Sequence, residues 1–127
     1  MGPKEPKSDI RDKTSGRRIE DVLLKAMFES APFYHNLKDT DGRFLLVSTL
    51  YENWLGLGKP EIIGKTIGEI GSDSVNVDSI KKIEKLILET GQTIETEAHA
   101  VHHDGKGQDR ILIKYPVYSD KGEVLAI

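Results

Sequence analysis

At 127 residues, the chain has the length of one domain with one modest hydrophobic core. Its 18 Lys and Arg residues are interspersed with 21 Asp and Glu residues, which argues against the concentrated basic face that nucleic-acid binding requires. The absence of cysteine excludes disulfides and thiol chemistry, and no apolar run approaches the ~20 residues that span a bilayer. We therefore expect a cytoplasmic domain without a nucleic-acid partner or a membrane contact.

The N-terminal part of the chain divides into two segments. Residues 1–16 carry alternating charges and few apolar side chains, so we expect a flexible leader or linker before a domain that covers residues 17–127. Apolar residues then recur at helical spacing, which predicts an amphipathic helix over residues 17–29. Pro32 ends this helix, and the core of the domain begins there.

A β-hairpin and three short helices are expected next. Residues 33–38 and 44–48 are apolar runs joined by a turn with Asp41-Gly42, a pair that favours hairpins. A short helix follows over residues 49–55. Two further single-turn helices are expected, one at Pro60 and one at Thr66.

The second half of the chain predicts one long helix and three strands. Apolar residues at helical spacing predict the helix over residues 78–90, and Gly91 suits its C-terminal cap. Residues 93–103 alternate as a strand with one wet face, residues 110–118 form the next strand, and the last begins at Glu123. Bulky residues occupy both faces of the strand at residues 110–118, so we expect a cover on each face, and its Pro116 suggests a bulge.

This order of elements, helices between a hairpin and three further strands, predicts an α+β domain with an antiparallel sheet and a helical layer on one face. Five segments in the same order resemble the PAS family of sensory domains over roughly residues 30–127. They read LKDTDGRFLLVS, YENWLG, EIIGKTIGEI, ILETGQTIETE and DGKGQDRILIKYPVYSDKGEVLAI.

The resemblance implies a five-stranded antiparallel sheet with strand order 2-1-5-4-3, whose inner face and helices enclose a small cavity. Ser48 stands where the family usually has Asn, so a hydroxyl must cap the following helix. The chain also ends inside the last strand, before the segment that commonly leads to an effector in this family, and we expect a fragment of a larger regulatory protein.

Two kinds of cofactor are disfavoured by the same resemblance. Haem-binding relatives generally use a histidine from the long helix, and residues 78–90 contain none; flavin photosensors need a cysteine. The only cluster of metal-ligand types comprises His99, His102, His103, Asp104 and Asp109. Strand geometry separates His99 and His103 by about 13 Å, so we expect no metal site there.

Lys114 is the most informative residue of the expected interior. Its strand position allows it to face the cavity, where a cation needs a ligand or a carboxylate partner. Two interpretations remain open: contact with a ligand, or an extended side chain that reaches Glu95 or Glu97 on the neighbouring strand.

Further pocket residues follow from the expected arrangement. Apolar and aromatic side chains either line the cavity or fill it, and a few polar or small side chains complete the candidate pocket. The first group is Leu45, Val47, Tyr51, Trp54, Ile83 and Ile87, and the second is Asn36, Thr96 and Ala98.

The apolar stripe of the N-terminal helix is a candidate dimer interface, because exposed together these side chains form a patch that favours burial. It comprises Ile19, Val22, Leu23 and Met27.

The resulting functional hypothesis is a signalling module without catalysis. It binds a small molecule or dimerises and thereby controls a linked effector such as a histidine kinase, a diguanylate cyclase or a transcription regulator. The alternative is a dimerisation or scaffolding module with a filled core and no ligand. A small enzyme would require a histidine–carboxylate pair inside the cavity, and the apolar segments offer no obvious one.

Overall fold

The computed structural model describes residues 18–71 and 76–127. The expected leader over residues 1–16 lies outside the described residues. Where the sequence predicts a helix over residues 17–29, the structure has α1 at Ile19–Glu29, and none of its residues is buried.

The four remaining helices lie where the sequence predicts them. They are α2 (Thr49–Leu55), α3 (Lys59–Ile62), α4 (Ile67–Ile70) and α5 (Val77–Thr90). The Ser48 hydroxyl accepts a hydrogen bond from the Tyr51 N–H and caps α2, which confirms the expected hydroxyl cap.

The expected strands are present with different bounds: the strand predicted from residue 110 begins earlier, at Gly107, and is divided. The first hairpin pairs β1 (Asn36–Lys38) with β2 (Phe44–Val47), and the second pairs β3 (Ile94–Val101) with β4 (Gly107–Lys114). The single strand expected over residues 110–118 ends at Lys114 and resumes after Pro116 as β5 (Val117–Tyr118), which pairs with β6 (Val124–Ala126). Pro116 has no backbone N–H for a ladder hydrogen bond, so it accounts for the break.

All three strand pairs are antiparallel, but they form three separate two-stranded sheets in the described residues. The ends of β1 and β6 are joined, because Lys38 and Ile127 exchange two backbone hydrogen bonds of 2.9 Å. An antiparallel bridge between Asp39 and Ala126 continues this contact. The complete strand order 2-1-5-4-3 remains a prediction.

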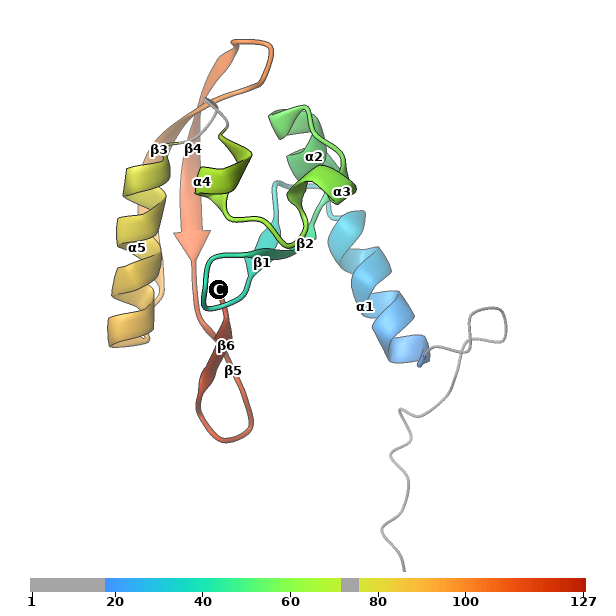
Figure 1. The fold of residues 1–127 in the computed structure, drawn as a ribbon, viewed down its shortest axis with the longest axis vertical. Helices are drawn as coiled ribbons and strands as arrows, with labels where there is room; N and C mark the ends of the chain where they lie inside the picture. The colour runs from blue at the N-terminus through green and yellow to red at the C-terminus, as the bar shows by residue number, and fades with distance from the viewer. Residues whose placement is uncertain (1–17, 72–75) are drawn as a thin grey trace, which may run out of the picture.

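The helices occupy different sides of this framework. Figure 1 shows α5 running along the β3–β4 hairpin, with α4 drawn between α5 and the pair formed by α2 and α3, while α1 lies beyond β2. The apolar core lies beneath the short helices, with Phe44, Trp54 and Ile62 among its buried members. No helix among the described residues is long and apolar enough to cross a membrane.

Candidate functional site

Three charged side chains from three different elements meet inside the domain. Lys38 ends β1, Glu84 lies in the middle of α5 and Lys114 ends β4. The Lys38 Nζ and the Lys114 Nζ each lie 2.9 Å from the same oxygen, Oε2 of Glu84. Exposure is 1% for Lys38 and 8% for both Glu84 and Lys114. These three residues, named here the Lys–Glu–Lys triad, are therefore a desolvated cluster of ionisable groups.

The periodicity of each element brings the triad together. Glu84 lies four residues after Ile80 and three before Ile87, so it shares the inward stripe of α5. Lys114 lies directly opposite Ile94 in the hairpin, so the two side chains lie on the same, inner face of the β3–β4 pair. Lys38 is held in place because its backbone bonds to Ile127 in both directions.

Burial and mutual repulsion shape the electrostatics of the triad. Burial, followed by the nearby Lys114 ammonium, lowers the pKa of Lys38 to about 8, against the opposing effect of Glu84. Burial alone would raise the pKa of Glu84, but the two ammonium groups outweigh it and the pKa is lowered. Burial and the Glu84 charge raise the pKa of Tyr51, which therefore keeps its proton at neutral pH.

The charge of the triad is unbalanced. When all three groups are ionised, two ammonium groups face one carboxylate, and the cluster carries a net positive charge. Each ammonium has three N–H donors, of which one is directed at Glu84. The arrangement is therefore suited chemically to a further anionic or hydrogen-bond-accepting group.

An aromatic cluster adjoins the triad through Tyr51, whose pKa responds to the charges of both Glu84 and Arg110. The Arg110 guanidinium lies over the rings of Tyr34 and Trp54, with its Cζ 3.6 and 5.0 Å from their centroids. Its Nε and Nη2 both donate to the side-chain oxygen of Gln108. The buried Trp54 Nε1 has no hydrogen-bond partner within the described part of the chain.

Lys114 is buried, as expected of an inward-facing cation, but its partner differs from the one considered. Glu95 and Glu97 pair in register with Ile113 and Ile111, so they lie on the opposite face of the hairpin from Lys114. The expectation that Lys114 reaches either glutamate is wrong, because alternation along the strand separates them. The carboxylate comes from α5 instead.

Most of the other candidate pocket residues face the interior. Val47, Tyr51, Trp54 and Ile87 are buried. The partly buried candidates are Asn36, Ile83, Thr96 and Ala98.

Leu45 is placed differently, since it is 43% exposed and lines an open surface depression with Lys25 and Pro60. In the short strand β2, Phe44 takes the buried position instead, with 0% exposure.

The sequence analysis did not single out Lys38, Glu84 or Arg110. The sequence pattern nevertheless indicates an inward position for each of them. Lys38 and Asn36 lie on the same side of one strand, and Arg110 and Lys114 lie on the same side of another. Glu84 interrupts the apolar stripe of α5. Charged residues at inward positions could have been grouped as mutual partners, because buried charges are usually paired.

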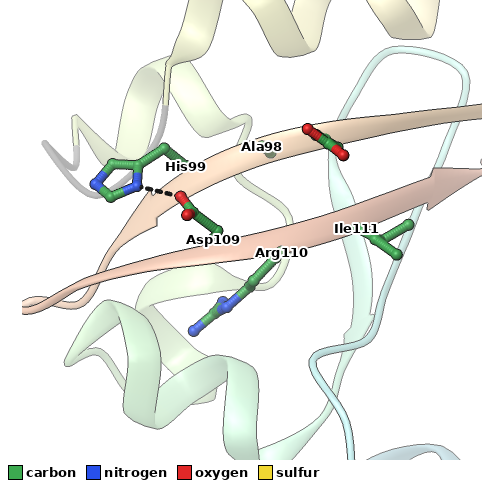
Figure 2. Close-up of a pocket in the computed structure, with 6 residues that line it drawn as sticks. Ala98, His99, Asp109, Arg110 and Ile111 are labelled. Carbon is green, nitrogen blue, oxygen red and sulfur yellow. Dashed lines mark hydrogen bonds and ion pairs between the residues drawn. The ribbon is translucent and has the colours of Figure 1, made fainter.

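A second depression lies along the β3–β4 hairpin and is lined by Glu97, Ala98, His99, Asp109, Arg110 and Ile111. Figure 2 shows His99 and Asp109 joined across the two strands. Alternation along β4 places Arg110 and Ile111 on opposite faces of the strand. Asp109 is almost fully exposed, and the described residues contain no group of three metal-ligand side chains. The other described histidine–carboxylate pair, His102 with Asp104, lies in the exposed turn of the hairpin. Neither pair lies in the interior where an acid–base site was considered.

The candidate dimer residues on α1 show mixed exposure. Ile19 and Val22 are partly buried, whereas Leu23 is 53% and Met27 is 72% exposed. The outer face of β4 also carries exposed apolar side chains, because Ile111 is 67% and Ile113 is 55% exposed. In the described chain α1 packs beside β2 and leaves this face of β4 open (Figure 1).

Comparison with known families identifies the fold. The sequence model of the PAS fold family matches residues 28–127, and the chain belongs to this family. No curated protein sequence matches the chain.

Solved structures with the same fold include several sensory proteins. VqmA bound to DPO is 20% identical with a TM-score of 0.66, and the match covers 83% of this chain and 54% of that one. For Vibrio cholerae VqmA without its target DNA the covered share of the relative is 47%, so the chain spans about half the length of the VqmA chains.

Two further structures match along most of their length. The PAS domain of Bordetella pertussis BvgS is 17% identical with a TM-score of 0.67, and the match covers 84% of this chain and 80% of that one. A sensory box sensor histidine kinase from Vibrio cholerae is 18% identical with a TM-score of 0.61, covering 84% and 85%. At this level of identity the likeness establishes the fold.

Proposed function

We propose that the chain is a sensory PAS module that binds a small molecule between its sheet and helices and passes the change to a linked effector domain. The observation that carries this proposal is the Lys–Glu–Lys triad, an inward-facing charged cluster with an excess of one ammonium group. The solved relatives support the same class, since one is bound to DPO and another is a sensor histidine kinase.

The energetics of buried charges support a functional role for the triad. Removing ions from water is costly, and replacing a buried ionic triad with apolar residues of similar volume often leaves stability unchanged or raises it. A core selected for stability alone would gain little from three buried charges. Recognition of a polar ligand is a reason to keep them.

The chemistry of the interior points to the class of ligand. Lys38 and Lys114 are buried with one carboxylate, and the partly buried Arg110 lies over the Trp54 ring, which contacts Tyr51. We therefore propose a small molecule with an acidic group, and an effector of the kinds that PAS modules control, such as a histidine kinase, a diguanylate cyclase or a transcription regulator. A cytoplasmic location and a role without catalysis belong to this proposal.

A second candidate function is a dimerisation module with a filled core. It is favoured by one observation: Glu84 already accepts hydrogen bonds from both lysines, so the triad holds together without a guest. The exposed Leu23 and Met27 of α1 and the exposed Ile111 of β4 would then be buried against a second copy.

Thermal unfolding with added ligands separates the two candidates. We would measure the unfolding midpoint of the wild type with small carboxylates, aromatic carboxylates and their uncharged amides. The sensory proposal expects a carboxylate that raises the midpoint, a loss of that rise in Lys114→Ala, and its retention in Lys85→Ala, which removes an exposed lysine of α5. The dimerisation module would replace the sensory proposal if no compound of the panel raises the midpoint and if sedimentation shows a dimer that Met27→Glu disrupts.

A further inference from the structure

The position of Glu84 between two ammonium groups resembles that of a bound carboxylate. One of its oxygens, Oε2, accepts both hydrogen bonds, each at 2.9 Å, from lysines on two different strands. The side chains of Lys38, Lys114 and Glu84 are 2, 9 and 11% exposed. The two ammonium groups thus converge on a point in the interior where a carboxylate oxygen sits.

The contact is also the link between α5 and the strands. Among the described residues, the side-chain hydrogen bonds that join α5 to β1 and β4 all end on Glu84. The lysines, in contrast, are fixed by strand backbones: Lys38 is bonded to Ile127, and Lys114 pairs with Ile94. The backbone positions that carry the two lysines therefore do not depend on Glu84.

We propose that Lys38 and Lys114 form a carboxylate-binding site, that Glu84 occupies it in the free protein, and that the ligand's carboxylate takes the place of Glu84. This inference rests on the proposed sensory function and narrows the ligand to a carboxylate compound. A carboxylate fits because its oxygens accept charge-assisted N–H···O bonds at the distances that Glu84 displays. Displacement of Glu84 releases α5 from both strands, so ligand binding and the position of α5 are coupled.

The proposal predicts that removal of Glu84 opens the site to carboxylates from solution. In Glu84→Ala, sodium acetate or propionate is expected to raise the thermal midpoint relative to sodium chloride of equal ionic strength. Half saturation is expected at a concentration at least roughly tenfold lower than for the wild type, because the internal competitor is gone. Glu89→Ala, which removes an exposed carboxylate from the same helix, is the matched control and should respond no more than the wild type.

A second variant ties the response to the lysines. Glu84→Ala combined with Lys38→Met and Lys114→Met should lose the response to acetate. If Glu84→Ala is unfolded in chloride, acetate is expected to restore its circular dichroism signal and cooperative unfolding. Absence of stabilisation or refolding by acetate would overturn the proposal. Equal stabilisation by sulfate and acetate would overturn the assignment to carboxylates.

These outcomes separate the inference from the proposed function. If Glu84→Ala responds to acetate while the wild type binds nothing from the panel, the carboxylate site stands and the sensory function fails. If the wild type binds a panel compound whose affinity Glu84→Ala does not raise, the sensory function stands and the displacement of Glu84 is refuted.

Discussion

The two ends of this domain are held together by different forces. Beneath the short helices, buried apolar and aromatic side chains such as Phe44, Trp54 and Ile62 pack into a conventional core. Beneath α5, the Lys–Glu–Lys triad is buried beside an apolar side chain, Ile87. Apolar packing stabilises the fold in proportion to the area removed from water. For buried ions, the attraction between opposite charges roughly offsets the free energy lost when the ions leave water. The short-helix end therefore depends on apolar burial alone, whereas the α5 end combines apolar burial with a charged cluster that adds little net stability; the proposed ligand site would account for that cluster.

Truncation of Glu84 tests this comparison with the largest expected effect. Glu84→Ala leaves two buried ammonium groups without a counter-ion, so we expect the free energy of unfolding to fall by about 3–5 kcal/mol in urea denaturation. Ile62→Ala, at the apolar end, should cost about 2–5 kcal/mol through lost burial and a cavity.

The two losses differ in their dependence on charge. Glu89→Ala breaks only an exposed pair with Lys85 and should cost less than about 1 kcal/mol. A cost for Glu84→Ala as small as that of Glu89→Ala would contradict the view that the triad is desolvated.

The pH dependence of stability gives the second test of the α5 end. Lys38 has a pKa of about 8 in the folded chain and an ordinary value of 10.5 when unfolded. Between these values the unfolded chain binds the proton that the folded chain has released, so the free energy of unfolding rises with pH. One pKa unit corresponds to about 1.4 kcal/mol, which gives a total of about 3 kcal/mol.

Denaturation of the wild type and Lys38→Met from pH 7 to pH 10 measures this rise. The difference between the two free energies should be flat below pH 8 and should grow above it, because methionine does not titrate. Glu84 and Lys114 face the Lys38 ammonium in the wild type, and both residues are retained in Lys38→Met. A difference that stays constant up to pH 10 would show that Lys38 is not desolvated.

Ser48 allows a smaller test at the opposite end. Its buried hydroxyl accepts hydrogen bonds from the N–H groups of Tyr51 and His35 and donates one to the carbonyl of Phe33. Ser48→Ala should lower the free energy of unfolding by about 2 kcal/mol in urea denaturation, because a helix cap and a buried network are lost together. Thr66→Ala removes the more exposed cap of α4 and should cost about 1 kcal/mol. Equal losses would mean that the network around Ser48 adds nothing to the cap.

The sequence predicted the apolar end more completely than the α5 end, for a physical reason. Helical periodicity and turn residues are local signals, and they placed α2 at residues 49–55 and α5 within one residue of its observed start. The triad depends on contacts 30 and 46 residues apart in the chain. Strand parity allowed Lys114 to face inward, but only the packing of α5 on β4 identifies its partner as Glu84. Pro116 predicted an irregularity, and the complete break between β4 and β5 followed from its missing N–H.

The smallest predicted effect compares the C-terminal caps of two helices, one at each end. Gly71 ends α4 and Gly91 ends α5, with φ of 66° and 68°. Alanine at either position should cost about 1 kcal/mol, because an L side chain is strained at positive φ. A methyl group on Gly91 would lie 2.5 Å from the hydroxyl of Tyr118, whereas at Gly71 no atom of the described residues lies within 4 Å of it.

Gly91→Ala should therefore lower the free energy of unfolding more than Gly71→Ala does. The difference should be about 1 kcal/mol, because the Tyr118 hydroxyl must move and give up its 2.9 Å hydrogen bond to the Gly91 carbonyl. In a Tyr118→Phe background the hydroxyl is absent, and the two alanine substitutions should then cost the same. If Gly91→Ala still costs more than Gly71→Ala in the Tyr118→Phe background, the contact between Gly91 and the Tyr118 hydroxyl is not the cause of the difference.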